Sequence, residues 1–168
     1  LGGGQVATGL RADGPGRYVA RDLDELYDMP LHLAAPGQAT RTTFTAAGVP
    51  VELVLWGART AGGQFTEADL IRDLGKIVDG HAGRMGAVPF DRYVFVVMFT
   101  HDGYGGLEHR NSSINIHNTY ALATRKHYEG LLELLSHELF HAWNGKRLAP
   151  PALLDFDYSR EAYTCLLY

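Results

Sequence analysis

Hydrophobic positions along the chain follow a strand period in some segments and a helix period in others. Residues 42–45 and 51–56 have the composition of strands, and the turn residues 48–50 separate them. Residues 93–99, with the sequence YVFVVMF, are apolar on both faces, which predicts a central strand. Residues 113–117 alternate between polar and apolar side chains, which predicts a half-exposed edge strand.

Two longer segments have helical spacing. The first follows Thr66, a good N-cap with Asp69 three residues later, and should end near Gly80. The second covers about residues 128–144 and should stop at Gly145. Each has one apolar stripe, formed by Leu70, Ile71, Leu74, Ile77 and Val78 in the first and by Leu131, Leu132, Leu135, Leu139 and Phe140 in the second. This order of strands and helices predicts an α+β fold in which helices pack against a mixed sheet.

The first 38 residues differ from the rest. We expect a short strand over residues 17–20 and a short acidic helix over residues 22–27, followed by the connector residues 36–38. The regular pattern begins only after this connector. We therefore predict a domain boundary near residue 38, with residues 39–168 forming the second unit.

Composition restricts the possible partners. The 168 residues are 46% hydrophobic and 20% charged, which is typical of a globular domain. The formal net charge is -4 and no basic stripe is present, so we do not expect nucleic acid as a partner. No apolar run approaches the ~20 residues that span a membrane, so we expect no membrane partner. The single cysteine, Cys165, excludes an internal disulfide framework and a cysteine-based metal site.

Neither end of the chain has the features of a natural terminus. The start, LGGG, has no initiator methionine and no charged segment typical of a signal peptide. Residues 163–168 are apolar and stop without a cap or a helix breaker. We expect the natural protein to extend beyond both ends.

The motif HELFH at residues 137–141 carries the clearest chemistry. His137 and His141 are four residues apart, so an α-helix brings both imidazoles onto one face, about one turn apart. Two neutral imidazoles at this spacing can bind one Zn²⁺ ion. Glu138 lies beside the metal position without having to bind it, so it can take a proton from the attacking water. A chance match to HExxH is the alternative, but the leucine-rich helix and the preceding strand favour a zinc site.

A catalytic zinc needs three protein ligands and an open position, and only two ligands are evident. Glu161, twenty residues after His141, has a spacing that suits a third ligand. It also suits the first turn of a new helix, where a carboxylate interacts favourably with the helix dipole. We expect the third ligand beyond Tyr168, and a histidine pair without it should hold zinc weakly.

Several motifs resemble one family. Residues 137–147, HELFHAWNGKR, are similar to the HExxH-x-W-N-x-K-R signature of the glycyl aminopeptidase family of zinc peptidases. Residues 104–109, YGGLEH, resemble the GGLEH loop of that family, and residues 156–158 and 161–164 resemble the stretch before its third ligand. These motifs cover roughly residues 90–168, and the strand–helix pattern extends the likeness back to about residue 41.

The resemblance implies the N-terminal lobe of a thermolysin-like, gluzincin-type catalytic domain. In such a lobe a mixed sheet with an edge substrate strand packs against helices, including the HExxH helix. Residues 1–38 would then be the end of a preceding β-rich domain and its connector. Residues 39–168 would be the N-terminal part of the catalytic domain, truncated before a third zinc ligand that the family supplies as a Glu just beyond Tyr168.

The resemblance also implies substrate-binding roles for Gly105, Gly106 and Glu108. Adjacent glycines let a ligand approach the backbone closely. The Glu108 carboxylate would pair with the free α-ammonium group of a peptide. The alternative is that the two glycines form only a turn and that Glu108 is solvated. The strand that follows, residues 111–117, would hold the peptide backbone by strand addition.

From these residues we predict a zinc-dependent aminopeptidase. It would release N-terminal residues, Gly or Ala by analogy to the family, from peptides with a free N-terminus, with Glu138 as the general base. One alternative is a thermolysin-type endopeptidase, which would not depend on Glu108. The other is a degenerate peptidase domain that acts as a binding module. We expect this segment alone to be incomplete and to have weak activity or none.

Overall fold

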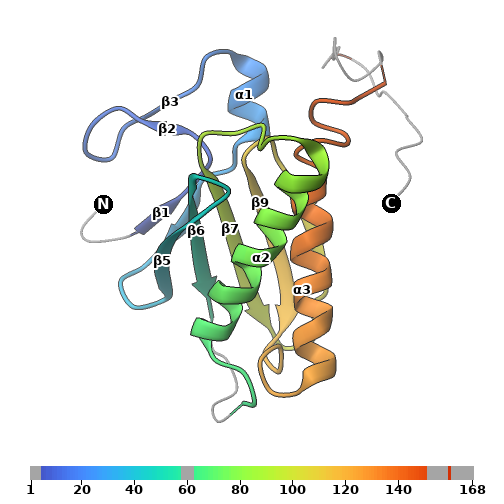
Figure 1. Cartoon of the computed structure of the whole chain (residues 1–168). Helices are drawn as coiled ribbons and strands as arrows, with labels where there is room; N and C mark the ends of the chain where they lie inside the picture. The colour runs from blue at the N-terminus through green and yellow to red at the C-terminus, as the bar shows by residue number, and fades with distance from the viewer. Residues whose placement is uncertain (1–4, 58–62, 151–158, 160–168) are drawn as a thin grey trace.

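The computed structural model describes residues 5–57, 63–150 and 159 (Figure 1). A five-stranded mixed sheet has the strand order β5-β6-β7-β9-β8. The strands are β5 (Ala39–Ala46), β6 (Val49–Trp56), β7 (Tyr93–Thr100), β8 (Gly105–Glu108) and β9 (Ser112–Asn118). β6, β7 and β9 run parallel, whereas β5 and β8 pair antiparallel at the two edges. The predicted α+β fold with a mixed sheet is confirmed.

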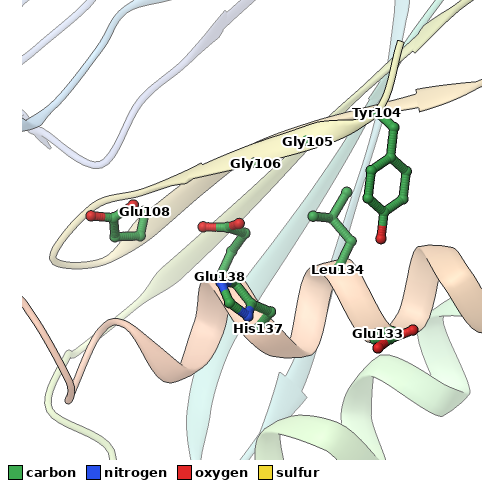
Figure 2. A pocket seen from close by; sticks show the side chains of 8 residues that line it. All are labelled: Tyr104, Gly105, Gly106, Glu108, Glu133, Leu134, His137 and Glu138. Atoms are coloured by element: carbon green, nitrogen blue, oxygen red, sulfur yellow. The ribbon is translucent and has the colours of Figure 1, made fainter. Parts of the chain in front are cut away.

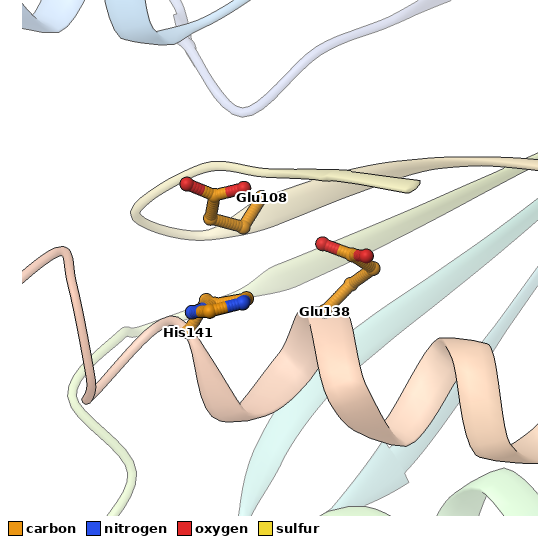
Figure 3. A group of neighbouring side chains, drawn as sticks. All are labelled: Glu108, Glu138 and His141. Carbon is orange, nitrogen blue, oxygen red and sulfur yellow. The ribbon is translucent and has the colours of Figure 1, made fainter. Parts of the chain in front are cut away.

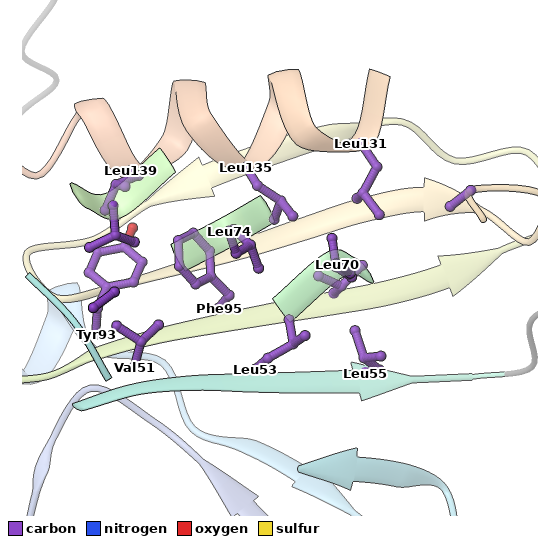
Figure 4. Close-up of a cluster of buried hydrophobic side chains, with 14 of the residues drawn as sticks. Val51, Leu53, Leu55, Leu70, Leu74, Tyr93, Phe95, Leu131, Leu135 and Leu139 are labelled. Atoms are coloured by element: carbon purple, nitrogen blue, oxygen red, sulfur yellow. The ribbon is translucent and has the colours of Figure 1, made fainter. Parts of the chain in front are cut away.

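Two long helices, α2 (Glu67–Met85) and α3 (Arg125–Phe140), cover one face of this sheet (Figure 1). Side chains alternate along a strand, so every second residue of β6 and β7 faces these helices. Figure 4 shows the cluster that results between the two layers. Its largest fully buried members are Val51, Leu53, Leu55, Tyr93 and Phe95 from the sheet and Leu70, Leu74, Leu131, Leu135 and Leu139 from the helices.

The N-terminal segment contacts the opposite face of the sheet. Its elements are β1 (Gln5–Ala7), β2 (Arg11–Ala12), β3 (Tyr18–Val19), α1 (Leu23–Asp28) and β4 (His32–Ala34). β1 pairs antiparallel with β4, and Ala7 and Ala34 pack in one buried cluster with Val54, Val94 and Val96. The short strand and the acidic helix predicted here are present, whereas the domain boundary near residue 38 stays a prediction.

Helix α2 begins as predicted and ends later than predicted. Thr66 and Asp69 form the reciprocal capping box, with the Thr66 side chain accepting from Asp69 N and the Asp69 side chain accepting from Thr66 N. The helix continues through Gly80 to Met85 and also contains Gly75 and Gly83, because each glycine inside a helix costs only about 1 kcal/mol. It stops at Gly86, which takes the left-handed conformation (φ +89°) that favours glycine.

Helix α3 spans residues 125–140 rather than the predicted 128–144. Thr124 caps its start, and its side chain accepts from His127 N. After Phe140 the backbone tightens, because the amide of Ala142 bonds to Leu139 O, three residues back. The chain therefore leaves the helix before Gly145, where φ is +113°.

The turn between β5 and β6 is shorter than predicted. It consists of Ala47 and Gly48, which have positive φ angles of +48° and +77°. Val49 and Pro50, which we expected in the turn, already belong to β6. A two-residue turn with two positive φ angles has a backbone twist that matches the right-handed twist of the strands it joins. β5 and β6 can therefore pair along all eight residues of each strand.

The prediction that residues 113–117 form an edge strand is wrong. β9 lies between β7 and β8, so β8 is the edge strand. The polar members of the alternation, Ser113, Asn115 and His117, are buried, and the two isoleucines between them are half-buried. The side-chain amide nitrogen of Asn115 is hydrogen-bonded inside the sheet, because it donates to Val96 O of the neighbouring strand β7 at 3.1 Å. A polar–apolar alternation therefore did not mark the solvent face of this strand.

Within the described ranges, none of the helices combines the length and apolar character that crossing a bilayer requires.

The contact between α3 and the sheet should dominate stability. Leu135→Ala removes a fully buried side chain and should lower the free energy of unfolding by about 2–5 kcal/mol. The matched control Leu33→Ala changes a side chain that is 56% exposed and should alter it by less than about 0.5 kcal/mol. Urea midpoints measure both, and equal shifts would contradict this assignment of the core.

Candidate functional site

The leucine stripe of α3 determines which residues face the edge strand. Leu131, Leu135 and Leu139 are fully buried in the core, so the adjacent side of the helix lies beneath β8. Glu138 points from this side toward Gly106 (Figure 2). Residues three and four apart on a helix share a face, which brings His137 and His141 onto this side together. Glu138 and His141 are buried, with 5% and 4% exposure, whereas His137 is exposed.

The two imidazoles are arranged as a pair. Nε2 of His141 lies 3.2 Å from Nε2 of His137. Two nitrogen ligands of a tetrahedral zinc, with bonds of about 2.0–2.1 Å, would be about 3.3 Å apart. His141 Nδ1 donates to the carbonyl oxygen of Asn144 at 2.8 Å, because a carbonyl can only accept. Nε2 of His141 then carries the lone pair, so the spacing of the pair and the tautomer of His141 both fit a zinc ion.

The Glu138 carboxylate lies directly beneath the glycines of β8. A Cβ atom on Gly106 would lie 2.2 Å from Glu138 Oε1, so only glycine permits this approach. Burial and, to a smaller extent, the negative charge of Glu108 together raise the pKa of Glu138 to about 6, with His141 partly offsetting the rise. A carboxyl group with a pKa near the working pH can both accept and return a proton.

A pocket of about 300 Å³ opens between α3 and β8 (Figure 2). The glycine loop predicted to bind substrate contributes Gly105, Gly106 and Glu108 to its wall. The remaining lining residues are Tyr104, Glu133, Leu134, His137 and Glu138. Glu133 and Leu134 did not appear among the predicted site residues, although they lie four and three residues before His137 and so share its helix face.

Glu108 approaches the same point from the end of β8. Its carboxylate, that of Glu138 and a ring nitrogen of His141 all lie within 4.8 Å of one another (Figure 3). Such a trio could itself hold a cation. Since His137 Nε2 lies only 3.2 Å from His141 Nε2, and imidazole suits zinc, the histidine pair is the better zinc ligand set. Glu108 and Glu138 then remain as two carboxylates beside the histidine pair.

Glu108 is connected to the N-terminal segment through Lys146. The Lys146 ammonium lies 2.8 Å from Asp28 Oδ1 and 3.8 Å from Glu108 Oε1. Asp28 Oδ2 also accepts from the backbone amide of Arg110 at 2.8 Å, and His109 Nδ1 lies 3.7 Å from Asp28 Oδ1. Burial alone would raise the pKa of Asp28, but hydrogen bonds from His109 and Lys146 outweigh it and lower the pKa. Asp28 is therefore a charged carboxylate close to the site.

No sequence motif indicated Asp28. It is 82 positions from Arg110 and 118 positions from Lys146, so only the folded chain brings these groups together. The proposed third ligand is a different case. Glu161 and the sequence around it lie outside the described residues, and a ligand beyond Tyr168 lies outside the chain.

The sequence profile of the M61 glycyl aminopeptidase family matches residues 130–168, which include His137, Glu138 and His141. No curated protein matches the chain. Among solved structures, the chain is similar to an aminopeptidase N family protein from Idiomarina loihiensis. The TM-score is 0.85 and the identity 33%, over 96% of this chain and 28% of that one.

Two structures from Deinococcus radiodurans share the fold at lower identity. An M1 zinc metallopeptidase has a TM-score of 0.54 and 15% identity, over 86% of this chain and 32% of that one. A mutant of an M1 zinc metallopeptidase bound to a Tyr-Ser-Ala substrate has a TM-score of 0.51 and 14% identity, over 84% of this chain and 32% of that one. The chain therefore spans about a third of these structures or less.

Zinc binding should depend on the histidine pair. His141→Ala removes one imidazole and should weaken zinc affinity roughly tenfold or more, as changes at metal sites commonly do. The control His101→Ala alters an exposed histidine outside the pocket and should leave the affinity unchanged. Competition with a chromophoric chelator measures both dissociation constants, and equal values for the two variants would exclude His141 as a ligand.

Proposed function

The chain resembles the M61 glycyl aminopeptidase family, and on this premise we propose that it is part of a zinc-dependent aminopeptidase. The observation that carries the proposal is the imidazole pair, 3.2 Å apart, beside a buried carboxylate beneath a glycine edge strand. We assign the fold to the N-terminal lobe of a thermolysin-like catalytic domain. The third zinc ligand would be a Glu in the segment beyond Tyr168.

His137 and His141 would hold the zinc ion through their Nε2 atoms. Zinc, when bound, would supply a Lewis acid that polarises the scissile carbonyl and lowers the pKa of the attacking water. The hydrogen bond from His141 Nδ1 to Asn144 O fixes the ring orientation and keeps Nε2 unprotonated. Because His137 is exposed at the mouth of the pocket, the open side of the site faces solvent and substrate.

Glu138 would act as the general base and then as the general acid. Its carboxylate takes the proton of the attacking water and returns it to the leaving amine. The raised pKa, about 6, suits both steps, because the group is ionised at neutral pH and still returns a proton readily. The close packing of Gly106 against this carboxylate fixes its position relative to a bound peptide.

A peptide would bind along the free edge of β8 by strand addition. This edge replaces the one that we predicted at residues 111–117, which β8 covers. The carboxylate of Glu108 would receive the α-ammonium group. The peptide would then continue past Gly106 and Gly105 toward Tyr104, along the pocket (Figure 2).

The spacing of the two carboxylates favours removal of a single residue. Oxygens of Glu108 and Glu138 lie within 4.8 Å of each other. One extended residue spans about 3.3–3.6 Å, so only one residue fits between an ammonium at Glu108 and a bond cleaved at Glu138. This distance supports an aminopeptidase over an endopeptidase. A preference for Gly or Ala at that residue follows from the family analogy.

Loss of the Glu138 carboxylate should abolish turnover. In the full-length protein, Glu138→Gln should lower kcat by about a thousandfold, within the range for general acid–base catalysis, while zinc content stays unchanged. The control Glu129→Gln changes an exposed carboxylate on the same helix and should retain kcat. Steady-state hydrolysis of alanyl-p-nitroanilide measures kcat, and metal analysis measures the zinc content. Near-normal kcat in Glu138→Gln would exclude Glu138 as the general base.

Free and blocked substrates should separate an aminopeptidase from an endopeptidase. The full-length wild-type protein should cleave Ala-Ala-Phe and leave its N-acetylated form intact, because only the free peptide offers an ammonium to Glu108. Glu108→Gln should raise KM for the free peptide about tenfold by weakening a charge-assisted hydrogen bond. Equal cleavage of both peptides would indicate the endopeptidase instead. No cleavage of either peptide by the zinc-loaded protein would indicate a binding module.

A further inference from the structure

Asp28 belongs to α1, in the segment before the sheet, yet it contacts the substrate side of the proposed site. Its carboxylate oxygens accept from Lys146 Nζ and from the backbone amide of Arg110, both at 2.8 Å. Both ion pairs of Lys146 are shielded, because the side chains of Asp28, Lys146 and Glu108 are only 14%, 24% and 20% exposed. Partial burial strengthens such contacts relative to ion pairs on an open surface.

The three groups form a row of alternating charge. Lys146 lies between the two carboxylates, 2.8 Å from Asp28 and 3.8 Å from Glu108. The shorter contact is the hydrogen bond, so the ammonium is engaged mainly by Asp28. The row carries a formal charge of about -1 at neutral pH, since one ammonium is shared by two carboxylates. That charge matches a single additional cation, such as the ammonium group of a peptide.

We propose that Asp28 is a positioning residue for amine recognition, because it holds Lys146 back from Glu108 and so keeps the Glu108 carboxylate available for the α-ammonium group of the substrate. The inference rests on the proposed aminopeptidase function. It assigns part of substrate recognition to the N-terminal segment. Without the Asp28 charge, Lys146 would pair with Glu108, and the row would become neutral.

Arg147 is another cation that interacts with the charge of Asp28, and its hydrogen bonds are made to other groups. Arg147 donates to the carbonyl oxygens of Arg110, Ala142 and Pro89. Among these two cations, Lys146 is therefore the one that can move from Asp28 to Glu108. The backbone bond from Arg110 to Asp28 fixes the tip of the β8–β9 hairpin, which is a structural role distinct from the charge effect.

Asp28→Asn separates the two roles. Its amide oxygen can still accept from the Arg110 amide, so the hairpin tip keeps its anchor while the negative charge is lost. In the full-length, zinc-loaded protein, KM for alanyl-p-nitroanilide should rise about three- to tenfold while kcat changes less than twofold, the pattern for lost ground-state binding. The double variant Asp28→Asn/Lys146→Met removes the competing ammonium and should return KM to the wild-type value or below it.

Lys146→Met provides a second test that does not depend on how Asp28→Asn folds. It leaves Glu108 without an internal cation, so KM should fall below that of the wild type. The proposal would be overturned if folded Asp28→Asn had the KM of the wild type. It would also be overturned if the KM of the double variant were as high as that of Asp28→Asn. If Asp28→Asn does not fold, an unchanged or higher KM in Lys146→Met would overturn it. Failure of the aminopeptidase function itself would be visible beforehand, as cleavage of N-acetylated peptide by the wild-type protein.

Discussion

The packing of α3 against the sheet is the contact on which the candidate site depends. Leu131, Leu135 and Leu139 are completely buried, and together they fix the rotation of the helix about its axis. In an α-helix, the position of a residue in the sequence sets the direction of its side chain around the helix axis. Once the leucines face the core, Glu138 and His141 must therefore lie beneath β8. A change of about one residue in helical phase would move the two imidazoles away from the groove.

The second constraint is the close approach of β8 to that helix. Gly106 lies where any side chain would collide with Glu138, so the edge strand can descend onto the carboxylate only as glycine. The strand end then delivers Glu108 to within 4.8 Å of the same carboxylate. The proposed removal of a single residue rests on this short distance between the two carboxylates. The N-terminal segment completes the arrangement, since Asp28 engages the only lysine that contacts Glu108 among the described residues.

Local patterns predicted the features that depend on neighbouring residues. The Thr66 capping box, the central strand and the helix that carries His137 all follow from spacings within a few residues. The bounds of α2, α3 and the β5–β6 turn were misplaced by a few residues, and the larger errors concern interactions between distant segments. Ser113, Asn115 and His117 are in register with Phe95, Val97 and Phe99 of the core cluster, so the helix layer buries them, while β8 takes the edge position that their polarity suggested for β9. Asp28 has no local signal at all, because its partners are more than 80 positions away.

The proposed chemistry depends on one zinc ion bound by His137 and His141 beneath the glycine edge. Anomalous diffraction from crystals of the full-length protein, collected on both sides of the zinc absorption edge, tests it most directly. We expect one zinc peak within about 2.0–2.1 Å of both Nε2 atoms, facing Gly106. A zinc peak elsewhere, with the imidazoles still 3.2 Å apart and no metal between them, would contradict it.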